Sequence, residues 1–195
     1  MDWMLTRLKT LFFKKPEISF SFMLRIAVLF LFFVLHAINN PILAQGAEVA
    51  AEPQSWFLSF IGRFHPMIVH FPVSLIFVVL FMEIIAGLKK TVNFKAAIKL
   101  LIIVSFVSSI VAVVTGLLLS GSGDYGTDAL SRHQWAGIIT MILSSLMVLA
   151  WYKSSRIVQK GLLVVTTVAV TIAGHYGASL THGEEYLTEL LPSDS

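Results

Sequence analysis

Long uninterrupted apolar segments are the feature that most limits what this chain can fold into. Four segments of about 20 residues contain almost no charge, and this is the length that an α-helix needs to cross the hydrocarbon of a bilayer. They cover residues 66–88, 96–119, 133–152 and 161–180. A membrane β-barrel would instead show alternating segments of about ten residues. The sequence therefore predicts an all-α fold, an integral membrane four-helix bundle.

The composition excludes a water-soluble domain. Of the 195 residues, 13% are charged and 56% are hydrophobic, with a mean hydropathy of +0.83, whereas a soluble domain has about a quarter charged residues. The absence of cysteine excludes disulfides, iron–sulfur clusters, thiolate zinc sites and covalently attached haem. We find no P-loop, dinucleotide fingerprint, nucleophile elbow or His-Glu-x-x-His motif. An electron-transfer or membrane-anchor subunit is therefore favoured over a stand-alone enzyme.

The segment before the first span is typical of a secretory signal peptide. A basic beginning, a ten-residue apolar core at 26–35 and a break that ends in the small residue Ala44 fit that pattern. Residues 18–38 could instead stay as a membrane anchor if Arg25 reaches the interface. We divide the chain into a signal peptide or retained anchor at 1–44, a linker at 45–55, a four-helix transmembrane domain at 56–192 and a tail at 193–195. We expect the aromatic segment at 56–64 to form a short interfacial helix.

The basic residues indicate the orientation of the spans. Twelve of the fourteen Lys and Arg lie before the first apolar block or in and beside the loops at 89–95 and 153–160, and only Arg63 and Arg132 lie on the other side. The positive-inside rule places the lysine-rich loops in the cytoplasm. We therefore predict a multi-pass protein of the bacterial inner (cytoplasmic) membrane with both mature termini on the extracytoplasmic side. This topology explains the basic residues, so we expect the lipid bilayer and no nucleic acid as a partner.

Five histidines are predicted to lie at the extracytoplasmic side of the bundle. They are His65 and His70 in the first span, His133 in the third, and His175 and His182 in the fourth. Ionisable residues inside a membrane are costly and usually face a bundle interior or a cavity. We therefore expect at least three of the five to share a site. In the alternative, a scaffold or anchor subunit without cofactor, they are hydrogen-bonded core residues.

Helix spacing limits how these histidines can hold a cofactor. His65 and His70 are five positions apart and do not share a helix face. His175 and His182 are seven positions apart, which separates them by about 10 Å along the helix axis. Ligand pairs must therefore come from different helices. We predict a haem b bridged by two of His70, His133 and His175, with His65 and His182 in supporting positions nearer the surface.

Neighbouring residues allow two further interpretations. Arg63 and Arg132 could pair with haem propionates, and the small residues beside the histidines allow either close helix packing or a slot for a macrocycle. The alternative to haem is a non-haem copper, iron or zinc ion at His70, His133 and His175, helped by acidic residues on the same side. Those acidic residues are Asp124, Asp128, Glu184 and Glu185. We interpret Glu83, near Lys89 and Lys90, as a carboxylate that reaches the interface, and we find no internal repeat strong enough to use.

Two segments resemble a known family. Residues 63–73, with His-Pro-Met-Ile-Val-His-Phe-Pro at 65–72, resemble the HPxxVHFP signature of a widespread, largely uncharacterised bacterial four-helix membrane domain. Residues 174–188 resemble the version that precedes planctomycete-type cytochrome c domains, and the resemblance covers about residues 56–192. It implies electron transfer with an extracytoplasmic cytochrome. Because the chain has no Cys-x-x-Cys-His motif, that cytochrome c-type protein would be a separate polypeptide.

Overall fold

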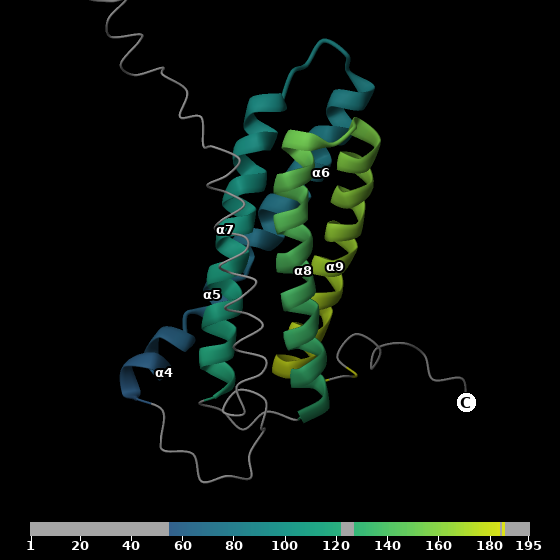
Figure 1. Ribbon diagram of the computed structural model, residues 1–195. Coiled ribbons are helices and arrows are strands. Elements are labelled where there is room, and N and C mark those ends of the chain that lie inside the picture. The colour runs from purple at the N-terminus through teal and green to yellow at the C-terminus, as the bar shows by residue number, and fades with distance from the viewer. Residues whose placement is uncertain (1–54, 122–126, 184, 186–195) are drawn as a thin grey trace, which may run out of the picture. The chain divides into compact units, whose positions relative to one another are not determined.

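Every regular element in the described part of the chain is a helix, as the apolar segments predict. The computed structural model describes residues 55–121, 127–183 and 185 (Figure 1). Its elements are α4 (Trp56–Gly62), α5 (His65–Ile68), α6 (His70–Leu88), α7 (Lys95–Ser120), α8 (Thr127–Lys153) and α9 (Arg156–His182). The predicted signal peptide or anchor, nearly all of the linker, and the tail lie outside the described residues.

Four stretches are long and apolar enough to cross a membrane. They are Trp56–Leu88, Lys95–Ser120, Asp128–Lys153 and Arg156–His182. The prediction of an all-α membrane bundle is therefore confirmed. The helices extend beyond the predicted spans, because hydropathy marks the part of a helix that lies in hydrocarbon, whereas hydrogen bonding continues the helix into the polar interface. As a result His133, which the sequence placed at a helix start, lies more than one turn inside α8.

Two prolines account for the divided first span. Pro66 occupies the first turn of α5, where its missing N–H costs no helical hydrogen bond. Pro72 has no N–H to donate to the carbonyl four residues earlier, and α5 and α6 are separated at Val69, whose backbone remains helical with φ −60° and ψ −25°. Helix α5 therefore leads directly into α6. His65 is the first residue of α5.

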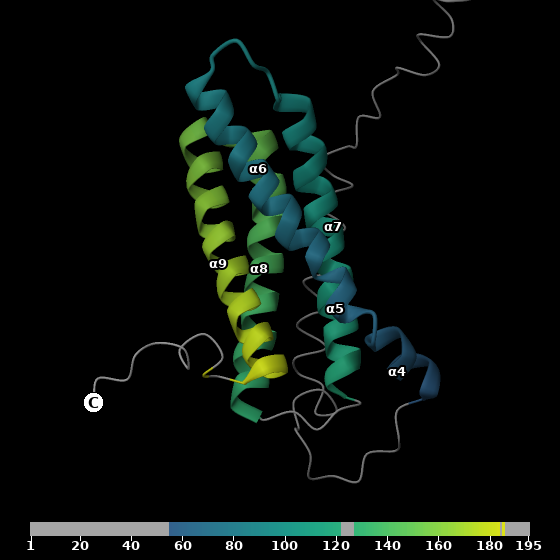
Figure 2. The ribbon, with the colours of Figure 1, turned by 180° about the vertical axis from the view of Figure 1, so that it is seen from behind.

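Helix α4 is set apart from the long helices and packs against the end of α7 (Figures 1 and 2). Gly62 is buried at this contact, where an added Cβ would lie 2.7 Å from the backbone nitrogen of Leu119. Only glycine permits so close an approach. Trp56 is 78% exposed and Phe57 is 55% exposed, and the interfacial location of this helix stays a prediction.

The four long helices form two antiparallel hairpins. We call α5–α6–α7 the first hairpin and α8–α9 the second. Helix α6 crosses the other long helices obliquely, running from α7 at its beginning towards α9 at its end (Figure 2). The side chains buried between the helices include Ile76, Val79, Ile102, Phe106, Met141, Met147 and Val170. Large apolar side chains also cover the outside, as expected for helices that face lipid tails.

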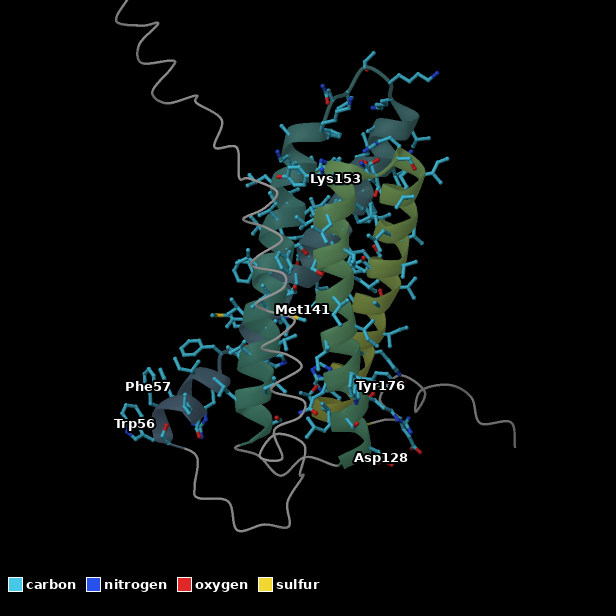
Figure 3. All side chains as sticks on the ribbon, viewed as in Figure 1. Trp56, Phe57, Asp128, Met141, Lys153 and Tyr176 are labelled. Carbon is cyan, nitrogen blue, oxygen red and sulfur yellow. The ribbon has the colours of Figure 1, made fainter. Side chains whose placement is uncertain are left out.

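The two ends of the bundle differ in chemistry. At one end α5 begins, α7 ends, α8 begins and α9 ends, and we call it the histidine end. At the other end lie Lys89, Lys95, Lys153 and Arg156, and we call it the lysine end. Figure 3 shows Lys153 at the lysine end, Asp128 and Tyr176 at the histidine end, and Met141 between them.

Candidate functional site

Two of the five predicted histidines meet at the histidine end. The ring centroids of His65 in α5 and His133 in α8 are 5.9 Å apart, and the two ring planes are inclined by 77°. Both side chains are half-buried. The pair therefore brings the first hairpin and the second together.

Each imidazole is held by a backbone carbonyl of its own hairpin. Nδ1 of His65 lies 2.9 Å from the carbonyl oxygen of Ala112 in α7, and Nδ1 of His133 lies 3.0 Å from that of Ala173 in α9. Because a carbonyl oxygen only accepts, each Nδ1 must carry the proton and donate it. In the neutral ring the other nitrogen, Nε2, then carries a lone pair. Across the described helices neither Nε2 has a hydrogen-bond partner.

A glycine follows each of these carbonyls by four residues. An added Cβ on Gly116 would lie 2.8 Å from Cε1 and 3.0 Å from Nδ1 of His65. On Gly177 it would lie 3.1 Å from Cε1 and 3.4 Å from Nδ1 of His133. In an α-helix the carbonyl of one residue points towards the residue four positions later, so a side chain at that position would shield the oxygen. Glycine leaves both carbonyls open to an imidazole from the neighbouring helix.

The site thus consists of two half-sites of the same design. We define a half-site as a histidine near the beginning of a hairpin, with an Ala-x-x-x-Gly segment near its end. The distance along the chain from histidine to glycine is 51 residues in the first half-site and 44 in the second. Because the two separations differ, a search for sequence repeats of one fixed length does not detect the two half-sites. Ala112, Ala173 and Gly177 escaped the sequence prediction, although the paired Ala-x-x-x-Gly segments were a signal that could have found them.

The other three histidines lie outside the pair. His70 is exposed and its Nδ1 lies 2.6 Å from the carbonyl oxygen of Pro66 on the same helix. His175 is exposed beside Tyr176, with ring centroids 5.7 Å apart, and His182 is exposed in the last turn of α9. For His70 the reason is helical phase, because a separation of five positions from His65 turns its side chain away from the first. The structure therefore brings together two histidines rather than the expected three.

The charged residues predicted for the site are exposed. Arg63 lies two residues before His65, and Arg132 directly precedes His133. Neither arginine has a carboxylate partner within residues 55–121 and 127–183. Asp128 and Glu185 are exposed, whereas Asp124 and Glu184 lie outside the described residues. Among the described residues no three His, Asp or Glu side chains are grouped so that they could hold a metal ion. The potential ligands that the structure brings together at this end are the two paired imidazoles.

An ion pair at the lysine end differs from the sequence prediction. The side chain of Glu83 is only 6% exposed, and Nη2 of Arg156 donates to its Oε1 at 3.0 Å and its Oε2 at 2.8 Å. Nη1 of Arg156 also donates to Oε1 of Gln159 at 2.9 Å. Glu83 therefore does not extend towards Lys89 and Lys90. It connects α6 to α9, and Lys99 of α7, whose Nζ lies 4.6 Å from the ring centroid of Tyr152 in α8, also links the two hairpins at this end.

The comparisons with known proteins support the membrane assignment. Residues 63–186 match the family described as "Predicted membrane protein (DUF2231)", and this range lies inside the predicted transmembrane domain. No curated protein and no solved structure matches the chain. The resemblance is confirmed at the level of a predicted membrane protein domain, whereas the HPxxVHFP signature and the association with cytochrome c remain predictions.

Proposed function

The chain belongs to the DUF2231 family of predicted membrane proteins, and we propose that it is a membrane haem b protein whose iron is held between His65 and His133. The observation that carries the proposal is the pair of imidazoles, whose ring centroids are 5.9 Å apart and whose Nδ1 atoms are both engaged by carbonyls. Metal–imidazole bonds are about 2.0–2.1 Å long, so two imidazoles on opposite sides of one ion, each with its Nε2 towards it, have centroids about 6 Å apart. The observed centroid distance agrees with this value, with the two ring planes inclined by 77°.

The number of protein ligands favours haem over a bare metal ion. Zinc sites use three or four protein ligands, but no group of three such side chains is found in the part of the chain that the structure describes. Haem needs only axial ligands from the protein, since the porphyrin supplies the other four nitrogens. When bound, it supplies one-electron redox chemistry.

The proposal changes the ligand set predicted from the sequence. His65 takes the place of His70 and His175, which lie outside the pair, while His133 stays. The exposed guanidinium groups of Arg63 and Arg132 supply positive charge next to the ligands along the chain, which suits haem propionates.

The charge distribution gives the orientation of the proposed site. All lysines of the described helices and Arg156 lie at the lysine end, and only Arg63 and Arg132 lie at the histidine end. The positive-inside rule then places the lysine end in the cytoplasm. The paired imidazoles would then lie at the extracytoplasmic side of the bacterial inner membrane. A haem there could exchange electrons with a separate soluble cytochrome c-type protein, but it could not by itself carry an electron across the whole bilayer.

An absorption spectrum tests the proposal. The full-length protein would be expressed with ample haem, purified in detergent and measured as isolated and after dithionite. We expect a Soret band and a reduced b-type α-band in the wild type, lost in His65→Ala and His133→Ala. His70→Ala and His175→Ala are the matched controls and should keep both bands. Wild-type protein without a Soret band, or loss of the bands in the controls alone, would refute the proposal, and stoichiometric copper, iron or zinc in its place would support the non-haem alternative.

A scaffold without cofactor is the second candidate function. The observation in its favour is that each imidazole joins two helices of its own hairpin, His65 to α7 and His133 to α9. Under this alternative His65→Ala and His133→Ala lower the melting temperature of a protein that has neither a Soret band nor bound metal. The same purified variants therefore distinguish the two functions.

A further inference from the structure

We infer that Gly116 and Gly177 are the positioning residues of the paired-imidazole site, one in each of its two half-sites, and that a haem bound there would be held by both imidazoles. The inference about haem rests on the proposed function, whereas the positioning of the rings does not. A haem held by both rings would have no position left for an external ligand. It would supply electron transfer rather than the binding of oxygen or of an organic substrate.

The contacts of the glycines single them out from their neighbours. The sites of a Cβ on Gly116 and Gly177 are taken up by the imidazoles of His65 and His133. Gly137 in α8 and Gly174 in α9 have nothing within 4 Å of such a Cβ. A methyl group therefore meets nothing at the second pair of positions. At Gly116 it would force the His65 ring to shift, and at Gly177 it would require the His133 ring to move by a few tenths of an ångström.

The hydrogen bond that each glycine permits controls the ligand atom. Donation from Nδ1 to a carbonyl fixes the tautomer, holds the ring plane and makes Nε2 a better ligand. A ring pushed off its carbonyl can turn over or move its proton to Nε2, and a protonated Nε2 cannot bind iron. Alanine at Gly116 or Gly177 therefore acts on the metal through the histidine, without touching the metal itself.

The two half-sites hold their imidazoles in the same way, and for this reason we expect both imidazoles to bind a haem iron. The Nδ1 to carbonyl distances are 2.9 Å and 3.0 Å, and in both half-sites the glycine lies four residues after the accepting alanine. The half-sites differ in one respect, because the carbonyl of Ala112 also accepts a hydrogen bond from Oγ1 of Thr115 at 3.1 Å. In both half-sites, however, the carbonyl orients the ring in the same way.

The first experiment examines the rings in the absence of haem. Nitrogen-15 NMR of histidine-labelled, haem-free protein in micelles distinguishes Nδ1–H from Nε2–H rings, with signals assigned from His65→Ala and His133→Ala. We expect the Nδ1–H signature for both rings in the wild type. Gly116→Ala should remove it from His65 alone, and Gly177→Ala from His133 alone. Gly137→Ala and Gly174→Ala should leave both unchanged. Equal spectra for Gly177→Ala and Gly174→Ala would overturn the inference.

The second experiment examines the haem-loaded protein. Gly116→Ala and Gly177→Ala should each bind haem at least tenfold more weakly than Gly137→Ala and Gly174→Ala. Carbon monoxide should leave the spectrum of reduced wild type unchanged and alter that of Gly177→Ala, where one axial ligand is weakened. Carbon monoxide binding to the wild type would overturn the equivalence of the half-sites. A wild type with the expected NMR signature but no haem would instead refute the proposed function and leave the positioning role intact.

Discussion

Replacing Arg156 with alanine should destabilise the bundle more than neutralising its buried partner Glu83. The glutamate side chain is 6% exposed and the arginine side chain 49%. Arg156→Ala removes two hydrogen bonds to the carboxylate, at 2.8 Å and 3.0 Å, and one to Gln159 at 2.9 Å. The carboxylate is then left buried without its partner. In Glu83→Gln the half-exposed guanidinium can turn towards water instead.

The expected size of the effect follows from this difference in exposure. Removing one partner of a fully buried ion pair costs about 3–5 kcal/mol. Because Arg156 is half-exposed and solvent screens the pair, we reduce the expected cost of Arg156→Ala to about 2–3 kcal/mol. Glutamine at position 83 keeps the volume and one acceptor oxygen, so Glu83→Gln should cost about 1 kcal/mol.

Equilibrium unfolding in mixed micelles with a denaturing detergent, followed by the helical circular dichroism signal, measures these changes. A double-mutant cycle should give a coupling of about 1–2 kcal/mol between Glu83 and Arg156. Lys160→Ala, which removes an exposed cation from the same helix, is the control and should stay within about 0.5 kcal/mol of the wild type. A larger loss for Glu83→Gln than for Arg156→Ala, or a coupling near zero, would refute this reasoning.

Three further predictions concern other parts of the molecule. Ser105→Ala should be neutral or stabilise the bundle by up to about 1 kcal/mol in the same assay, because the Oγ of Ser105 is buried without a partner in the described helices. For comparison, Ser109→Ala should destabilise the bundle by about 1 kcal/mol, because the Oγ of Ser109 donates to the carbonyl of Phe106 at 2.7 Å. Gly62→Ala, whose Cβ would lie 2.7 Å from the α7 backbone, should cost about 1–3 kcal/mol and speed proteolysis within α4, and unchanged proteolysis would contradict the packing described. Reporter fusions should place Lys90 in the cytoplasm and Gly121 outside, and an inverted pair of results would reverse the proposed orientation.

The apolar segments predicted the helices well because their length has one main physical cause. A stretch such as 96–119 is long enough to span hydrocarbon, and the only way to satisfy its backbone there is a helix. The ends were less predictable, because polar residues such as Thr127 and Arg156 can begin a helix outside the hydrocarbon. The depth of His133 within α8 was underestimated for that reason.

The candidate site was predictable in its residue type but not in its pairing. Histidines from the first, third and fourth spans were expected at one end, but the prediction ranked them by depth. The structure pairs His65 with His133 because rotation of each helix about its axis decides which side chains point inward. Membrane helices are apolar on their lipid-facing and buried sides alike, so periodicity in the sequence carries little information about that rotation.

The enclosure of each imidazole–carbonyl bond within one hairpin has a consequence for biosynthesis. Chains are made from the N-terminus, and early parts can fold before later ones are synthesised. The first hairpin contains all that it needs to join His65 to Ala112, and the second contains all that it needs to join His133 to Ala173. Only the docking of the two brings the rings together. A nascent chain that has inserted one hairpin therefore offers only one imidazole of the pair, and a ligand that requires both can be captured only after insertion is complete.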